Sequence, residues 1–139
     1  MSRIKQLSIF VENKPGQITD VTTLLSKNGL SIKSINLVDS SDFGLLRVIV
    51  DDVQKAKEVL DDNGISLKIT DVFAVSIDDH VGSFNEVVLA LSTNNINVEY
   101  TYTVSNSHNA SFIFKVNSGK FNEAIAILQE KNIKVINEV

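Results

Sequence analysis

The sequence predicts an α+β fold made of two copies of one βαββαβ unit. Three observations lead to this prediction. Apolar positions in the first half of the chain recur in the second half at a nearly constant offset. Stretches with the period of a strand alternate with stretches that have the period of a helix. Turns that contain glycine and asparagine separate many of these stretches.

The internal repeat has an offset of 66 residues, which grows to 68 near the end of each copy. Apolar positions match along the whole repeat while surface positions differ, as is typical of a duplicated fold. The matched pairs include Gly16 with Gly82, Val48 with Phe114 and Leu60 with Leu128. The repeat therefore predicts two domains, residues 1–70 and residues 71–139.

The first repeat begins with the alternation of a half-buried strand, in which Leu7, Ile9 and Val11 are apolar. The next apolar residues have helical spacing, and Asn28-Gly29 ends that helix. Residues 40–44 form the turn between the second and third strands. The six predicted elements cover residues 7–11, 18–25, 30–38, 45–50, 53–60 and 65–69.

The second repeat follows the same order, over residues 72–77, 84–91, 96–104, 110–117, 121–128 and 133–138. Both helices of each repeat must bury their apolar stripes on one face of the same sheet. Each repeat is therefore expected to be a ferredoxin-like sandwich with an antiparallel sheet and both helices on one face. Only Thr70-Asp71 separates the two repeats, so the chain either turns sharply there or continues as one strand shared by two sheets.

Composition narrows the class of protein. The 139 residues carry a net charge of −4 and no cysteine, which argues against nucleic-acid binding and excludes thiolate metal sites. No stretch approaches the roughly 20 apolar residues of a membrane span, so a cytoplasmic protein without a membrane partner is expected. His80 and His108 have no partners at metal-ligand spacing, and the sequence contains no phosphate-binding or dinucleotide motif. No metal, cofactor or catalysis is therefore expected.

The turn Asn13-Lys14-Pro15-Gly16-Gln17 is the strongest local signal. Pro15 fixes one φ angle, and Gly16 allows a ligand to approach the backbone closely. The turn opens a helix, whose free N–H groups favour a carboxylate or phosphate. The second copy, Asp79-His80-Val81-Gly82-Ser83, keeps the glycine but not the proline. One turn is therefore expected to bind a ligand, whereas the other is structural; a plain helix entry is the alternative for both.

The segment from Val11 to Ile18 heads a βαββαβ unit and is followed, after the helix, by Asn28-Gly29-Leu30-Ser31-Ile32. This pattern resembles the ACT domain, a small regulatory module of amino-acid metabolism. The resemblance covers nearly the whole chain as a tandem pair. It implies a stand-alone double ACT protein that binds a free amino acid or a similar small carboxylate and forms a homodimer.

The resemblance also implies where the ligand sits, namely where the first strand-to-helix turn of one unit meets the second strand of its neighbour. In this sequence the implied turn residues are Asn13, Lys14, Pro15, Gly16, Gln17 and Ile18. The implied strand residues are Val98, Tyr100 and Tyr102. A second, less complete site would use Asp79, His80, Gly82, Ser83, Ser34 and Asn36.

The strand that carries the two tyrosines is expected to show Ile96, Val98, Tyr100, Tyr102 and Val104 on one face. A pair of tyrosines could cover an apolar ligand side chain and offer hydroxyl groups to its polar end. They could equally be core residues whose hydroxyl groups reach the rim. The sequence leaves both interpretations open.

Asp42, Phe43 and Arg47 form a further candidate cluster. Arg47 is expected to point away from the helices, where its guanidinium could bind a ligand carboxylate or pair with Asp42. The Asp42 pair is the favoured interpretation. Phe43 is expected at a hairpin tip, as a ligand contact or a dimer contact.

Three other functions compete with that of a regulatory binding module. A small enzyme would need a nucleophile–base set that the sequence does not show. An RNA-binding domain would expose aromatic residues on its third strand, but Phe112 and Phe114 match the core positions Leu46 and Val48. An assembly protein with a vestigial ligand turn is the remaining alternative. The identity of the amino acid and of any regulated partner is not encoded in a recognisable motif.

Overall fold

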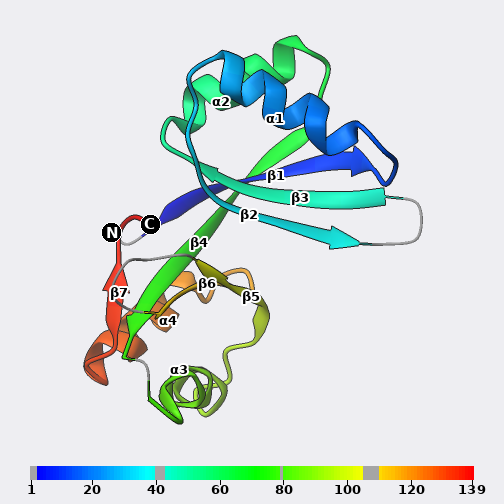
Figure 1. Ribbon diagram of the computed structural model, residues 1–139. Coiled ribbons are helices and arrows are strands. Elements are labelled where there is room, and N and C mark those ends of the chain that lie inside the picture. The colour runs from blue at the N-terminus through cyan, green and yellow to red at the C-terminus, as the bar shows by residue number, and fades with distance from the viewer. Residues whose placement is uncertain (1–2, 40–42, 79, 105–109) are drawn as a thin grey trace. The chain divides into compact units, whose positions relative to one another are not determined.

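The computed structural model describes residues 3–39, 43–78, 80–104 and 110–139. Its helices and strands follow the predicted order (Figure 1). Contacts divide the chain into two compact units: a first unit of residues 5–70, and a second unit of residues 1–4 and 71–139. All of the described helices are too short or too polar to cross a lipid bilayer.

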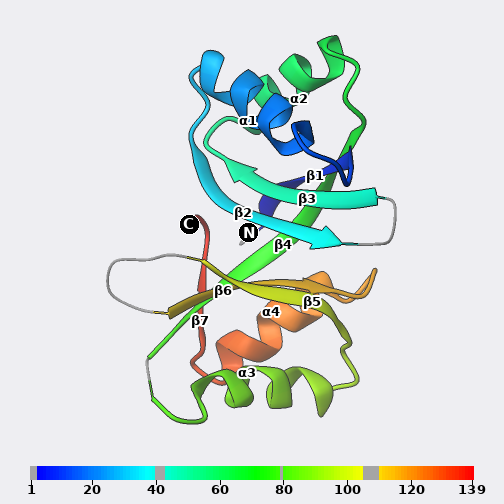
Figure 2. The same cartoon turned by 45° about the vertical axis from the view of Figure 1, so that its right-hand side comes forward.

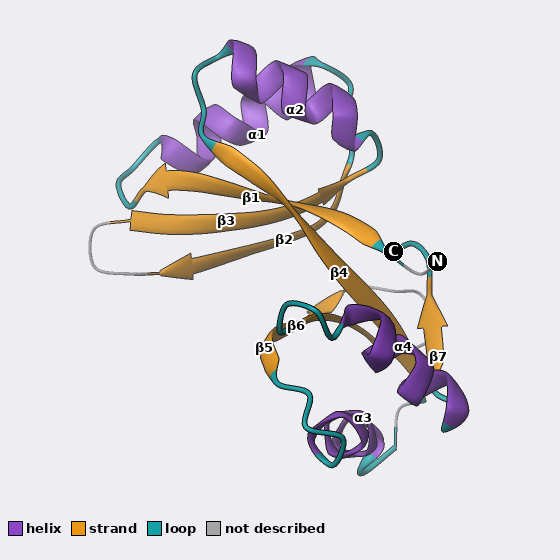
Figure 3. Cartoon of the chain, turned by 180° about the vertical axis from the view of Figure 1, so that it is seen from behind, coloured by secondary structure: helices purple, strands orange, loops and turns teal. Residues whose placement is uncertain are grey.

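The first unit is a sheet with strand order β2-β3-β1-β4 and with α1 and α2 on one face (Figure 3). Its apolar core lies between the helices and that face of the sheet, where Leu7, Leu25 and Leu60 are completely buried. The elements are β1 (Ile4–Glu12), α1 (Gln17–Lys27), β2 (Ile32–Asp39), β3 (Phe43–Val50), α2 (Val53–Asp62) and the beginning of β4 (Leu67–Ile77).

The second unit repeats this architecture with strand order β7-β4-β6-β5, and with α3 and α4 on one face (Figure 2). Its core is aromatic: Phe73 stacks on Phe114 at 5.6 Å between ring centroids, and Phe121 meets Phe73 edge-on. The elements that follow β4 are α3 (Ser83–Ser92), β5 (Val98–Val104), β6 (Ala110–Val116), α4 (Phe121–Glu130) and β7 (Lys134–Ile136). The predicted ferredoxin-like fold of two βαββαβ repeats is confirmed.

The junction of the two repeats is a single strand. β4 runs from Leu67 to Ile77 without a break, so the sharp turn that the sequence left open at Thr70-Asp71 does not occur. Both polar side chains have partners. Thr70 Oγ1 lies 3.1 Å from Ser8 Oγ, and Asp71 Oδ2 accepts a hydrogen bond of 2.7 Å from Arg3 Nη1.

Residue Arg3 explains why the first four residues group with the second unit. Besides the ion pair with Asp71, its guanidinium lies over the ring of Phe121, 4.2 Å from the centroid. Its Nη2 also donates a hydrogen bond to Asn122 Oδ1.

Each repeat contains an irregularity of strand pairing at the same position. The register between β2 and β3 shifts after Ile32, and the register between β5 and β6 shifts after Val98, which is the matching residue of the repeat. A bulge of one residue moves all following side chains to the opposite face of the sheet. This irregularity decides the orientation of the tyrosines in β5.

The turn between β2 and β3 is shorter than predicted. Phe43 and Gly44 are the first residues of β3 and pair with Glu12 and Val11 of β1. The expectation that Phe43 lies at the hairpin tip is therefore wrong. β1 extends to Glu12, which pairs with Phe43 in the sheet. Residues 40–42 lie outside the described part of the chain.

Candidate functional site

The turn between β1 and α1 has the backbone that its glycine predicts. Gly16 adopts a left-handed conformation, with φ of 91°, at the N-cap of α1. The N–H of Lys14 donates to Glu12 O at 3.0 Å, and the N–H of Asp20 donates to Gly16 O at 3.0 Å. No side chain among the described residues caps α1. The first turn of the helix thus keeps N–H groups available to an anion.

The ammonium group of Lys14 lies beside the turn. Its Nζ is 2.9 Å from Glu12 Oε2, and more than half of each side chain is exposed. The hydrogen bond to Glu12 and the charge of that carboxylate raise the pKa of Lys14. Lys14 therefore stays positively charged at physiological pH, within the same turn that opens α1.

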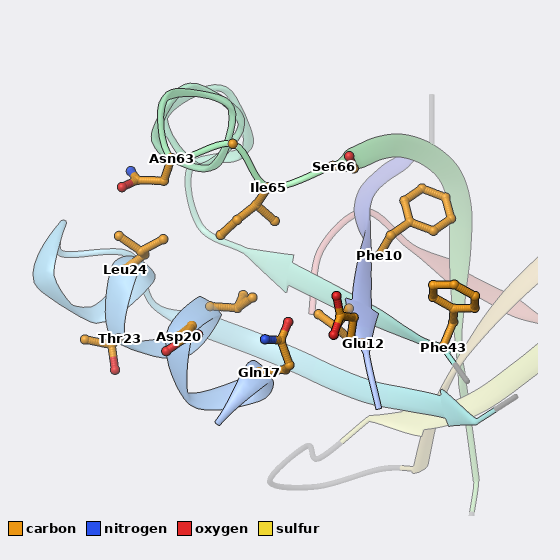
Figure 4. A pocket seen from close by; sticks show the side chains of 13 residues that line it. Phe10, Glu12, Gln17, Asp20, Thr23, Leu24, Phe43, Asn63, Ile65 and Ser66 are labelled. Atoms are coloured by element: carbon orange, nitrogen blue, oxygen red, sulfur yellow. The ribbon is translucent and has the colours of Figure 1, made fainter. Parts of the chain in front are cut away.

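A pocket of about 590 Å³ adjoins this turn within the first unit (Figure 4). Two of its lining residues, Phe10 of β1 and Ser66 just before β4, are joined by a hydrogen bond of 3.0 Å from Phe10 N–H to Ser66 O. Figure 4 shows Gln17, Asp20 and Leu24 on α1 and Phe10 and Glu12 on β1. The lining residues are Phe10, Val11, Glu12, Gln17, Asp20, Val21, Thr23, Leu24, Phe43, Asn63, Gly64, Ile65 and Ser66.

The structure brings only part of the predicted turn-and-hairpin site into this pocket. Gln17 and Phe43 line it, whereas Asn13, Pro15 and Ile18 lie on the exposed surface of the turn. Asp42 lies outside the described residues. Its pairing with Arg47 therefore stays a prediction. Arg47 itself is opposite Ser8 of β1 and Asn36 of β2 in the sheet.

That pairing places Arg47 on the face of the sheet away from the helices, as predicted, because its neighbours Leu46 and Val48 belong to the helix-side core. Ser34 and Asn36 share the face of Arg47, since they pair with Ile49 and Arg47 of β3. Ser34 is buried, whereas Asn36 is half-buried.

The described residues of the second turn have the same backbone geometry as those of the first. Gly82 has φ of 92°, and the hydrogen bonds from His80 N–H to Asp78 O and from Glu86 N–H to Gly82 O match those of the first turn. The two turns therefore differ in their side chains. His80 is exposed, Ser83 is buried, and Asp79 lies outside the described residues.

The predicted common face of β5 is wrong, because of the bulge. Val98 pairs with Val116 and packs against the helix-side core of the second unit. Tyr100 and Tyr102 pair with Lys115 and Ile113, so they lie on the opposite face. Their rings are parallel within 15°, with centroids 6.5 Å apart. The two rings therefore stack on each other on the face of the sheet away from Val98.

Sequence analysis missed several polar residues of the pocket, namely Glu12, Asp20, Thr23 and Asn63. The sequence predicts that Asn63 ends a helix. In the structure its Nδ2 donates a hydrogen bond of 2.8 Å to Val59 O in the last turn of α2. Glu12 and Asp20 flank the predicted turn by one and three residues. Asp20 and Thr23 could have been identified from helical spacing, because they follow Gln17 at intervals of three residues on α1. No local pattern shows that residues 63–66 lie beside this part of α1.

Comparison with known proteins decides the family. The model of the ACT domain pair matches residues 2–139. The chain belongs to this family. The ACT domain pair predicted from the turn and the repeat is thus confirmed. No curated protein matches the sequence.

Solved structures agree with this ACT assignment. A protein from Bacteroides thetaiotaomicron is 34% identical, with a TM-score of 0.90 over 97% of this chain and 92% of that chain. The ligand-free regulatory subunit of aspartate kinase from Thermus thermophilus is 14% identical, with a TM-score of 0.66 over 94% and 93%. That subunit from Thermus flavus is 18% identical, with a TM-score of 0.64 over 94% and 92%. The two subunits share the fold of this chain.

Proposed function

We propose that this ACT domain pair is a non-catalytic, cytoplasmic sensor of a free amino acid or a similar small carboxylate. The observation that carries the proposal is the β1–α1 turn. An uncapped helix N-terminus, a left-handed Gly16 and the charged Lys14 lie together there. N–H groups at a helix start and a nearby ammonium group both favour a carboxylate.

The ligand's carboxylate would accept a hydrogen bond from the N–H group of Ile18, with the Asn13 amide nearby, whereas the N–H group of Gln17 donates to Lys14 O within the turn. Pro15 holds this turn in place through its fixed φ angle. In keeping with the family resemblance, the second strand of an ACT unit would complete the site. Tyr100 and Tyr102 are its proposed contacts, and Val98 is excluded because it packs in a core.

Regulation would arise if the ligand binds one arrangement of ACT units better than another. A dimer of this chain is part of the proposal, because β2 is the outer strand of the first unit and carries exposed apolar side chains. The regulated partner would recognise the arrangement that the ligand favours.

Thermal unfolding in the presence of each of the twenty amino acids tests the proposal. A ligand at 100 times its dissociation constant adds about 2.7 kcal/mol to the free energy of unfolding. For a chain of this size, we expect one or two amino acids to raise the midpoint by roughly 5 to 10 °C. If none of the twenty raises it, the sensor function is wrong and an assembly role takes its place.

A further inference from the structure

The pocket beside the turn has a chemical character of its own. Its wall contains two carboxylates, from Glu12 and Asp20, and two amides, from Gln17 and Asn63. No described residue that lines it is a lysine, an arginine or a histidine. The ammonium group of Lys14, 2.9 Å from Glu12 Oε2, balances only one of these two carboxylates. The net negative charge that remains in this concave site favours a cation over an anion.

We infer that this pocket binds the ammonium group and the apolar side chain of the ligand. We further infer that Lys14 occupies the ammonium position when no ligand is bound. The inference deepens the proposed function and rests on it for the amino-acid class of ligand. The α1 turn would hold the carboxylate, and the pocket would hold the rest of the molecule.

The ion pair between Lys14 and Glu12 is suited to such an exchange. The two atoms are 2.9 Å apart, but over half of each side chain is in contact with solvent. Exposed ion pairs of this kind contribute little to stability, so their opening costs little. A ligand ammonium can therefore replace the Lys14 ammonium at Glu12, which frees Lys14 to approach the ligand carboxylate.

Apolar residues supply the remaining wall. Val21, Leu24 and Ile65 form one side, and Figure 4 shows the rings of Phe10 and Phe43 together at one end. Phe10 is 54% exposed and Phe43 is 63% exposed, which is unusual for large apolar side chains. Aromatic faces attract cations and cover aliphatic chains, so these rings suit both parts of such a ligand.

The second unit contains a smaller pocket of about 380 Å³ at the matching position of the repeat. Glu86 takes the place of Asp20 there, and Lys131 takes the place of Asn63. The lysine balances the carboxylate, so this pocket lacks the preference for a cation. Substitution of Glu86 thus provides a matched control with the same charge change in the other unit.

The test measures binding by isothermal titration calorimetry. The probes are the twenty amino acids, their N-acetyl derivatives, and three simple amines: isobutylamine, isopentylamine and phenethylamine. N-acetylation removes the ammonium charge, whereas the amines lack the carboxylate. We expect acetylation to weaken binding of the recognised amino acid at least about tenfold, because a charge-assisted hydrogen bond is lost.

Two near-isosteric variants test the carboxylates. Glu12→Gln and Asp20→Asn should each weaken amine binding about tenfold, whereas Glu86→Gln should leave it unchanged. Lys14→Met should strengthen amine binding severalfold, because the internal competitor is gone. The midpoint of thermal unfolding of each variant shows whether its fold is kept.

The outcomes separate the two claims. If the amino acid binds but neither acetylation nor Glu12→Gln and Asp20→Asn weakens it, the pocket assignment is wrong while the sensor function stands. If the amines bind and respond to the variants but no amino acid binds, the pocket assignment stands and the sensor function is wrong. If Lys14→Met weakens amine binding, Lys14 does not compete with the ligand's ammonium group at Glu12. If no probe binds, both claims are wrong.

Discussion

Gly16 and Gly82 begin α1 and α3 with φ angles of 91° and 92°, and a Cβ on either would meet no atom within 4 Å. The two positions therefore share one backbone geometry. A side chain at either would be strained by its φ angle rather than by a steric clash. Any difference between the turns must come from neighbouring side chains such as Lys14 and Pro15, which the second copy lacks.

The tyrosines of β5 give a prediction at this scale. Tyr102 and Thr103 are adjacent, but Tyr102 pairs with Ile113 and Thr103 pairs with Phe112 on the helix side. Tyr102→Ala should weaken binding of the recognised amino acid about fivefold, since about 1 kcal/mol of aromatic contact is lost. Thr103→Ala should change it less than twofold. Calorimetry measures both, and equal effects would remove this face of β5 from the site.

Single residues also show which features of the site can be predicted from the sequence and which cannot. The left-handed glycine and the helix entry could be predicted, because the signal is local. The place of Phe43 could not, because it depends on Glu12 being its partner in the sheet, 31 positions away. The pocket was missed for a similar reason: Asn63 and Ile65 reach it only after α2 has folded back along α1.

At the scale of elements, helix α2 has the clearest local determinant. Asp52 is its N-cap and accepts a hydrogen bond of 3.1 Å from Lys55 N–H. Asp52→Ala should lower the free energy of unfolding by about 1 kcal/mol, because that N–H loses its partner. Asp52→Asn keeps an acceptor and should cost much less. Urea unfolding measures both, and equal losses would show that the cap does not stabilise the helix.

The bulges of β2 and β5 are the part of the strands that simple alternation missed. A strand read with strict period two places Val98 with Tyr100, but the shift after Val98 separates them. The first repeat does contain a sequence signal for the bulge, because its apolar residues Ile32, Ile35 and Leu37 are spaced by three and then two residues. That spacing fits a bulge at the same place in both copies, because Ile35 and Leu37 pair with the core residues Val48 and Leu46.

At the scale of the whole molecule, the duplication and both cores were predictable, whereas the continuous strand β4 was not. Thr70-Asp71 interrupts an apolar pattern and resembles a turn. Both side chains are satisfied within a strand only because Ser8 and Arg3 meet them. These partners are 62 and 68 positions away, so no local pattern contains them.

Self-association is a prediction at this scale. β2 is the outer strand of its unit, and Ile35 and Leu37 are 46% and 42% exposed. We expect a dimer by size-exclusion chromatography with light scattering. The double variant Ile35→Lys, Leu37→Lys should be a monomer, because charges on an outer strand prevent pairing. Leu89→Lys, at an exposed apolar residue of α3, should remain a dimer; if it dissociates equally, β2 is not the interface.

The central claim is that the first turn, and not the second, binds the ligand. Calorimetry of Gly16→Val and Gly82→Val, with the amino acid that shifts thermal unfolding, tests it most directly. Both variants should lose about 1 to 3 kcal/mol of stability, because a β-branched residue is strained at these φ angles. The account predicts that Gly16→Val abolishes binding and that Gly82→Val leaves affinity within twofold of the wild type. Unchanged affinity in Gly16→Val, or equal loss in both variants, would contradict it.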